Sequence, residues 1–263
     1  MTPLTALVIA ATFLGGLRAS EAAVSKAELA GVEAVLPSDR LLPLSLPLQG
    51  EKQTRPLQEW LGATPSIWIL ADYTCESLCG PVVSIVAGAL AHSGLAPGTD
   101  FRLIVVGLDP KDSAADALAM KQVQIGERSD LADHSYFLRG SAGDVGKLAD
   151  AFGFRFRYDR ERDQFAHPAA AFVVSPDGHV MHALSGLLLD ATTLRLALVD
   201  AGQGKIGWFA DHVSLICYGF DPVSGSYNLA VGRLLAGTAL VSILALGALI
   251  TVLIGRERWA RES

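Results

Sequence analysis

Hydrophobic and polar positions fall into blocks between residues 66 and 202, and each block has the length of one strand or one helix. Short, continuous apolar runs predict buried strands, whereas apolar residues at a spacing of three and four predict helices. The predicted strands are 66–73, 101–110 and 135–140, and the predicted helices are 81–95, 111–126, 141–154 and 190–202. Glycine, or Asp followed by Pro, ends most of these blocks, as is typical of element boundaries.

The segment 167–186 breaks this alternation, because two apolar strands in it flank a Pro-Asp-Gly turn and predict a hairpin. Alternating strands and helices indicate an α/β layer with parallel strands, and the hairpin adds antiparallel ones. We therefore expect an α/β fold of the thioredoxin-like kind, with a mixed central sheet, over residues 42–204.

Two apolar stretches lie outside this domain. Residues 4–17 carry no charge, are too short to span a bilayer, and precede small residues near Ala22, so they predict a secretory signal peptide. Residues 234–254 also carry no charge and are long enough to predict a transmembrane helix. Arginines follow in the tail and favour its cytoplasmic side. The expected location is therefore the cytoplasmic (inner) membrane of a bacterial-type cell, with the soluble domain on the periplasmic side.

The expected organisation has six parts. They are a signal peptide (1–22), a linker (23–41), the thioredoxin-like domain (42–204), a membrane-proximal segment (205–233), the transmembrane helix (234–254) and a cytoplasmic tail (255–263). The net charge is −6. Nucleic-acid binding calls for a basic face, so this class of function is set aside.

The candidate chemistry is carried by Cys75 and Cys79, which follow the first predicted strand in the sequence ADYTCESLCGP. At a helix start the two side chains lie one turn apart, within reach of a disulfide or of one soft metal ion. The positive end of the helix favours a thiolate at Cys75. A permanent disulfide clip is poorly motivated, because a loop this short gives little stabilisation. The third cysteine, Cys217, lies in an apolar stretch, which favours a buried small hydrophobe over a free thiol or an intermolecular bridge.

A metal site needs a further ligand, and His167 is the strongest candidate because it directly precedes the strand that faces the cysteine helix in this kind of fold. Two thiolates and an imidazole suit Cu(I), and the same set can hold Cu(II). His179 and His182, on either side of the hairpin's returning strand, are lesser candidates. The residues alone leave copper binding and thiol–disulfide chemistry both open.

The sequence resembles the Sco/SenC copper chaperones, which have a thioredoxin fold and are tied to cytochrome c oxidase assembly. The resemblance covers about residues 42–204. It is carried by the strand leading into CESLC, the VVGLDP strand end, the segment FGFRFRYDRERDQFAHPAAAFVVSPDGHV and the final helix LRLALVDA.

The resemblance implies that Cys75, Cys79 and His167 bind copper. It also implies that the protein delivers the metal to the binuclear copper site of oxidase subunit II, or reduces the cysteines of that site. The main alternative is a thiol–disulfide oxidoreductase that acts on subunit II or another exported protein through the two cysteines alone. Asp109 is a further candidate, as a supporting or docking carboxylate. The chain departs from many family members at Glu76, where they have proline, and in its expected C-terminal anchor.

Overall fold

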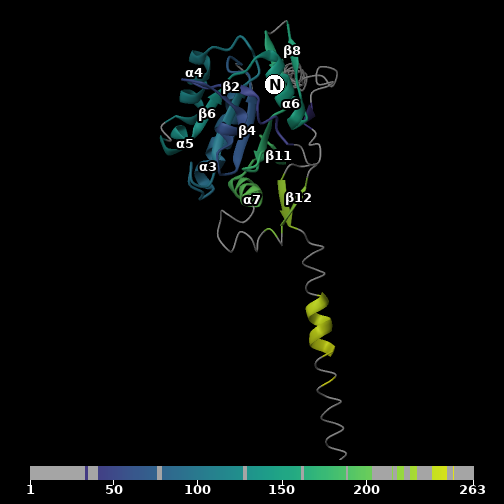
Figure 1. The fold of residues 1–263 in the computed structure, drawn as a ribbon. Coiled ribbons are helices and arrows are strands. Elements are labelled where there is room, and N and C mark those ends of the chain that lie inside the picture. Colours follow the sequence, from purple (N-terminus) through teal and green to yellow (C-terminus); the bar gives the residue numbers. More distant parts are fainter. Residues whose placement is uncertain are drawn as a thin grey trace, which may run out of the picture. The chain divides into compact units, whose positions relative to one another are not determined.

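The fold was examined in a computed structural model (Figure 1). The structure describes residues 33–34, 41–75, 79–126, 129–160, 163–187, 189–202, 215, 218–221, 226–229, 239–247 and 251. The expected signal peptide, the tail, Glu76 and Cys217 lie outside the described residues. Most of the linker and of the membrane-proximal segment also lies outside them.

The elements follow the predicted order, with several short additions. The strands are β1 (Glu33–Ala34), β2 (Pro47–Gln49), β3 (Thr54–Pro56), β4 (Ser66–Ala71), β5 (Arg102–Gly107), β6 (Ser135–Leu138), β7 (Phe154–Arg155), β8 (Arg157–Asp159), β9 (Gln164–Ala166), β10 (Ala170–Val174), β11 (Val180–Ser185), β12 (Tyr218–Asp221) and β13 (Ser226–Leu229). The helices are α2 (Leu57–Leu61), α3 (Cys79–His92), α4 (Ala114–Ile125), α5 (Ser129–Asp133), α6 (Ala142–Phe152) and α7 (Ala191–Ala201).

A five-stranded sheet with the order β11-β10-β4-β5-β6 forms the centre of the domain. Its strands β4, β5 and β6 run parallel to one another, and β10 runs antiparallel to both β4 and β11. The mixed sheet of a thioredoxin-like α/β fold is therefore confirmed. The predicted hairpin of residues 167–186 supplies its antiparallel strands.

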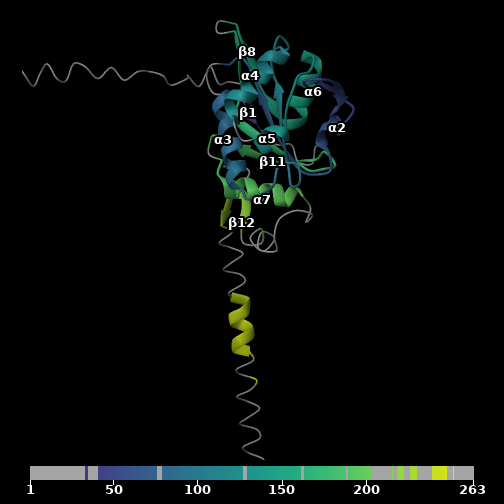
Figure 2. The same cartoon turned by 90° about the vertical axis from the view of Figure 1, so that its left-hand side faces the viewer.

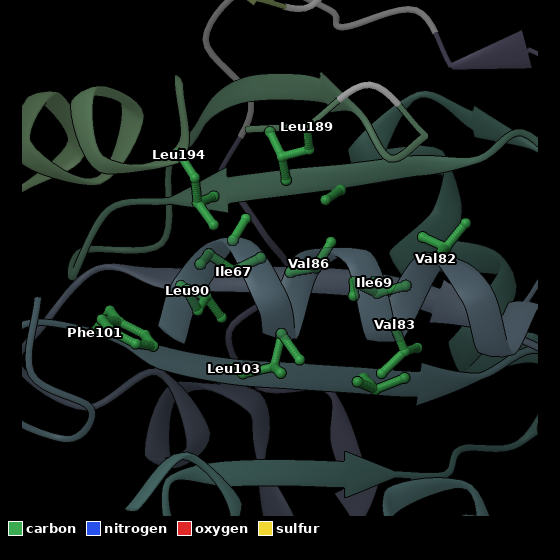
Figure 3. Close-up of a cluster of buried hydrophobic side chains, with 14 of the residues drawn as sticks. Ile67, Ile69, Val82, Val83, Val86, Leu90, Phe101, Leu103, Leu189 and Leu194 are labelled. Carbon is green, nitrogen blue, oxygen red and sulfur yellow. The ribbon is translucent and has the colours of Figure 1, made fainter. Parts of the chain in front are cut away.

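Both faces of this sheet are buried, which explains why its strands read as continuous apolar runs. In β4, Ile67 and Ile69 belong to one core cluster, and Trp68 and Leu70 belong to the other. Helices α3 and α7 pack on the first face, while α2 and α6 pack on the second (Figure 2). Figure 3 shows the first cluster, where side chains of α3 lie against β4 and β5.

At the starts of several helices, a side chain supplies hydrogen bonds to backbone N–H groups that have no partner within the helix. At the start of α4, the Ser113 hydroxyl oxygen accepts a bond from the Asp116 N–H group, and the Asp116 carboxylate accepts one from the Ser113 N–H group. This reciprocal arrangement is a capping box. At the start of α7 the Asp190 side chain accepts bonds from the backbone N–H groups of Thr192 and Thr193.

The prediction of a transmembrane helix over residues 234–254 is wrong. Within this stretch the structure describes a helix at residues 239–247 and helical backbone at Thr251. The nine consecutive helical residues that the structure describes extend about 14 Å, which is less than half of a hydrocarbon core of roughly 30 Å. Across the described part of the chain, every helix is too short or too polar to cross a membrane.

Candidate metal and redox site

The candidate site lies at the end of the central sheet where β4 finishes. The chain leaves β4 at Ala71 and reaches Cys75 four residues later, and α3 begins at Cys79. Because β10 runs antiparallel to β4, with Ala171 opposite Ile69, the residues that enter β10 arrive at this same end. The sheet register therefore brings His167 to the two cysteines, as the sequence predicts.

The central contact joins Cys79 and His167. The Cys79 Sγ atom lies 2.8 Å from the His167 Nε2 atom. On its other side, the imidazole Nδ1 atom lies 3.0 Å from the Pro168 carbonyl oxygen, which can only accept a hydrogen bond. This bond assigns the ring proton to Nδ1, so Nε2 presents its lone pair to the Cys79 thiol. A histidine that ligates a metal commonly has the same arrangement.

Cys75 and Cys79 are both reduced, with no disulfide between them. Cys79 is fully buried, whereas Cys75 is partly exposed. A hydrogen bond with Cys75 and burial together raise the pKa of the Cys79 thiol far above its ordinary value. The thiolate predicted from the sequence was that of Cys75, and Cys79 is the residue that begins α3. At Cys79 the cost of burying the charge outweighs the helix dipole, so the metal-free site holds a neutral thiol.

His167 is held by aromatic packing as well as by its hydrogen bond. Its ring lies 5.7 Å, centroid to centroid, from the buried ring of Phe154. Burial is the main reason that the pKa of His167 lies below its ordinary value. The neutral imidazole is therefore the dominant form at pH 7, and the neutral form is the one that binds metals.

The loop between β4 and Cys75 is fixed by two buried carboxylates that the sequence reasoning did not identify. Asp72 accepts bonds from the Thr74 N–H and hydroxyl groups, each at 3.0 Å, and from the Phe165 N–H group at 3.3 Å. Asp112 accepts a bond of 3.1 Å from the Tyr73 N–H group. For Asp72 the sequence did hold a sign of such a role, because an acidic residue follows an apolar strand directly and stands three positions before Cys75.

Burial raises the pKa of Asp112 to about 6, and the neighbouring carboxylates act in the same direction. Asp109, proposed above as a supporting or docking carboxylate, caps the turn that follows β5. Its side chain accepts a bond of 2.8 Å from the Lys111 N–H group, and its backbone carbonyl accepts one from the Asp112 N–H group. Its role at the candidate site stays a prediction.

The lesser histidine candidates lie away from the cysteines. His179 follows the turn between β10 and β11, and Val174 at that end pairs with Ser66, the first residue of β4. His179 is therefore at the opposite end of the sheet. His182 lies on β11, where its Nε2 atom is 2.7 Å from the Asp200 carboxylate of α7. Both histidines belong to other parts of the domain.

The donor set of Cys75, Cys79 and His167 fits a soft metal ion in chemistry, because it combines two sulfurs with one imidazole nitrogen. Its present spacing is that of a hydrogen-bonded group. A metal with bonds of roughly 2.0–2.3 Å to nitrogen and sulfur would separate the two donor atoms by more than 3 Å, whereas Sγ and Nε2 are 2.8 Å apart. In the described part of the chain, no group of three or more His, Cys, Asp or Glu residues is already spaced to hold a metal ion. Binding would require a small opening of this contact.

Residues 64–196 match the SCO1/SenC family model, and this match covers just over half of the chain. A search of curated proteins found no match. Among solved structures, the chain is similar to a candidate electron transfer protein from Aquifex aeolicus VF5, with 23% identity and a TM-score of 0.55 over 63% of this chain and 95% of that one.

Two Sco proteins are also among the structural neighbours. BsSco, a member of the Sco family of cytochrome c oxidase assembly proteins in which a disulfide switch was identified, is 19% identical with a TM-score of 0.53 over 65% of this chain and 98% of that one. The copper-bound ScoI of Arabidopsis thaliana is 14% identical with a TM-score of 0.49 over 59% of this chain and 94% of that one. The chain shares its fold with the Aquifex protein and with BsSco, and the family match shows that it belongs to the SCO1/SenC family.

Proposed function

We propose that this protein is a copper chaperone for cytochrome c oxidase assembly, with Cys75, Cys79 and His167 as the ligands of its copper cargo. The observation that carries the proposal is the meeting of these residues at one end of the sheet. Cys79 contacts both Cys75 and the His167 Nε2 atom, whose lone pair the Pro168 bond leaves available. Membership of the SCO1/SenC family and the naming of BsSco as an oxidase assembly protein support the same function.

The geometry suggests how the cargo would enter and leave. Cys75 is partly exposed and Cys79 is buried, so an incoming copper ion would meet the Cys75 sulfur first. The Cys79 thiol would then lose its proton, and the Cys79–His167 contact would open to admit the ion. A target protein could reverse these steps by offering its own thiolates and imidazoles in exchange. We propose the binuclear copper site of oxidase subunit II as that target.

Copper stoichiometry tests the assignment directly. The purified, reduced chain is loaded with Cu(I) without oxygen, alongside Cys75→Ala, Cys79→Ala and His167→Ala. The expected result is one copper per wild-type chain and a large loss of affinity in each variant. His92→Ala is the matched control, because His92 is exposed and its Nδ1 atom contacts the Gly88 carbonyl within its own helix. A wild-type chain that retains no copper would refute the proposal.

The second candidate function is thiol–disulfide exchange, which the contact between the two reduced cysteines favours. The Cys75 thiolate would attack a disulfide of the target protein and form a mixed disulfide, releasing one target thiolate. The Cys79 sulfur, on losing its proton, would then attack Cys75, releasing the second target thiolate and leaving a Cys75–Cys79 disulfide. Two electrons pass from the chain to the target, which is an exported protein such as oxidase subunit II.

The two functions differ in their need for His167. Copper binding loses a ligand in His167→Ala, whereas exchange needs only the two sulfurs. Measured rates of reduction of a model disulfide should therefore persist in His167→Ala and disappear in Cys75→Ala. If the variant retains exchange and the wild type binds no copper, the oxidoreductase is the function.

We also propose that the domain works outside the cytoplasm. The apolar run at residues 4–17, followed by small residues, is the observation that supports this location. In such a compartment the cysteines would need a dedicated reductant to stay available for copper. Fractionation of cells that produce the protein should place the domain in the extracytoplasmic fraction, and its recovery with cytoplasmic proteins would contradict the proposal.

A further inference from the structure

Asp72 is a fully buried carboxylate that is not among the proposed copper ligands. It follows β4 directly and has no measurable exposure to solvent. A carboxylate in the protein interior carries a large desolvation cost unless hydrogen bonds compensate for it. The bonds that compensate here come from two segments that are far apart in the sequence.

The two oxygens of Asp72 serve different segments. Oδ1 accepts both bonds from Thr74, in the loop that leads to Cys75. Oδ2 accepts the N–H group of Phe165, which lies 93 positions away in β9 and two positions before His167. The backbone carbonyl of Asp72 also accepts a bond of 3.3 Å from the Cys75 N–H group. Asp72 is thus hydrogen-bonded both to the loop that carries Cys75 and to the strand that leads to His167.

The strand that carries this bond has little other backbone attachment to the central sheet. Within the described residues, β9 pairs with β8 in a separate two-stranded sheet, and β8 has no other partner strand. Aromatic contacts of Phe165 with Phe156 and Tyr158 hold the hairpin together. Such contacts are less directional than a hydrogen bond to a charged acceptor. The Asp72–Phe165 bond is therefore well placed to fix the position of the backbone that leads from β9 to His167.

We propose that Asp72 is a positioning residue that locks the histidine segment to the cysteine loop and so sets the distance between His167 and Cys79. For its copper readout this inference rests on the proposed function, but its structural content does not. Residues that orient metal ligands without touching the metal typically change metal affinity by about 10–100-fold when they are replaced. We expect a loss in that range when the link to Phe165 is broken.

The decisive variant is Asp72→Asn. Asparagine keeps the size of the side chain and one carbonyl oxygen for Thr74, but its amide group cannot accept the Phe165 N–H bond. In the copper-free protein, we expect faster hydrogen exchange at the Phe165 amide. We also expect loss of the nuclear Overhauser contact between the His167 ring and the Cys79 β-protons. Asp100→Asn is the matched control, because Asp100 accepts a backbone N–H bond from Ala96 in a loop before β5.

A double-mutant cycle tests whether Asp72 acts through the histidine. Copper affinity is measured for the wild type, Asp72→Asn, His167→Ala and the double variant. If Asp72 positions His167, Asp72→Asn should weaken binding by about 10–100-fold in the wild type and by much less when His167 is absent. Equal losses in both backgrounds would overturn the proposal, as would unchanged exchange at Phe165.

Two further measurements keep the outcomes distinct. If Asp72→Asn does not fold, native-state hydrogen exchange on the wild type decides. The Thr74 and Phe165 amides should then open together, with the same free energy, and independent opening would overturn the proposal. If the wild type binds no copper, the proposed function fails. In that case the role of Asp72 is tested by the copper-free measurement alone, namely whether Asp72→Asn loses the contact between His167 and Cys79.

Discussion

The Cys79 Sγ atom and the His167 Nε2 atom lie 2.8 Å apart although 88 positions separate them in the sequence. Two structural features produce this contact. The antiparallel register of β10 against β4 brings the chain back to the end of the sheet at which α3 begins. The bond from the imidazole Nδ1–H group to the Pro168 carbonyl then turns Nε2 toward the sulfur. The predictions below follow from this contact and its surroundings.

Copper affinity should rise with pH. The pKa of Cys79 is raised, so this thiol must release a proton when the metal binds, whereas the lowered pKa of His167 leaves its imidazole neutral at pH 7. Each proton released makes the apparent affinity about tenfold stronger per pH unit. Competition with a chelator of known affinity between about pH 6 and pH 8 measures this slope. An affinity that does not change with pH would show that Cys79 is not a ligand.

Alkylation should distinguish the two cysteines of the site. Cys75 is partly exposed, while Cys79 is buried and its pKa is raised, so Cys79 presents little reactive thiolate. Brief treatment of the native, reduced chain with iodoacetamide should modify Cys75 well before Cys79. Mass spectrometry of the separate peptides also keeps Cys217 apart from both. Loading with Cu(I) should protect Cys75, and equal labelling with and without copper would count against its role as a ligand.

Replacement of Phe154 by alanine should affect both stability and the site. The Phe154 ring is 2% exposed and lies against the His167 ring. Replacement of a buried phenylalanine by alanine lowers the free energy of unfolding by about 3–5 kcal/mol. Replacement of Phe154 also removes the ring that packs against His167. Phe152→Ala is the control, since Phe152 is equally buried and its ring contacts are with Trp68 and Phe172.

Denaturant unfolding and copper titration together separate these effects. The two variants should lose similar stability, but copper binding should weaken more in Phe154→Ala. Similar copper affinities in the two folded variants would show that the ring contact with His167 has no part in metal binding.

Much of the domain could be predicted from the sequence because its strands are buried on both faces. The apolar runs that became β4, β5 and β6 are continuous for that reason, and the hairpin of β10 and β11 has a Pro-Asp-Gly turn at its centre. His167 was identified from its place before β10. The sheet register then determined its meeting with Cys79, which an argument from topology can anticipate.

The features that were missed depend on contacts between distant segments. The short hairpin of β8 and β9 has mixed polar and aromatic residues with no clear period, so the sequence alone gave little sign of it. Asp72 was placed within the predicted strand 66–73. Its bond to Phe165 forms only when β9 is folded against the loop that follows β4. The apolar run at 234–254 predicted a spanning helix from its length and lack of charge, and among the described residues every helix is too short or too polar to cross a membrane.

Asp112 provides a final prediction about stability and pH. Its pKa in the folded protein, about 6, lies above its ordinary value, so between about pH 4 and pH 6 the folded state binds more protons than the unfolded state. The free energy of unfolding must therefore lose a contribution as pH rises through this window. Asp112→Asn removes that contribution, while its side-chain oxygen can still accept the Tyr73 N–H bond.

The variant should consequently lose less stability than the wild type when pH rises from about 4 to 7. Asp116 supplies a control of opposite sign. Hydrogen bonds with Ser113 lower the pKa of Asp116, so its contribution is present at neutral pH and is lost as pH falls through that lowered pKa. Asp116→Asn should therefore cost most at neutral pH and least in acid. Urea unfolding of the three proteins at several pH values measures both trends. Parallel curves for the wild type and Asp112→Asn would mean that Asp112 titrates normally and does not carry the cost of its burial.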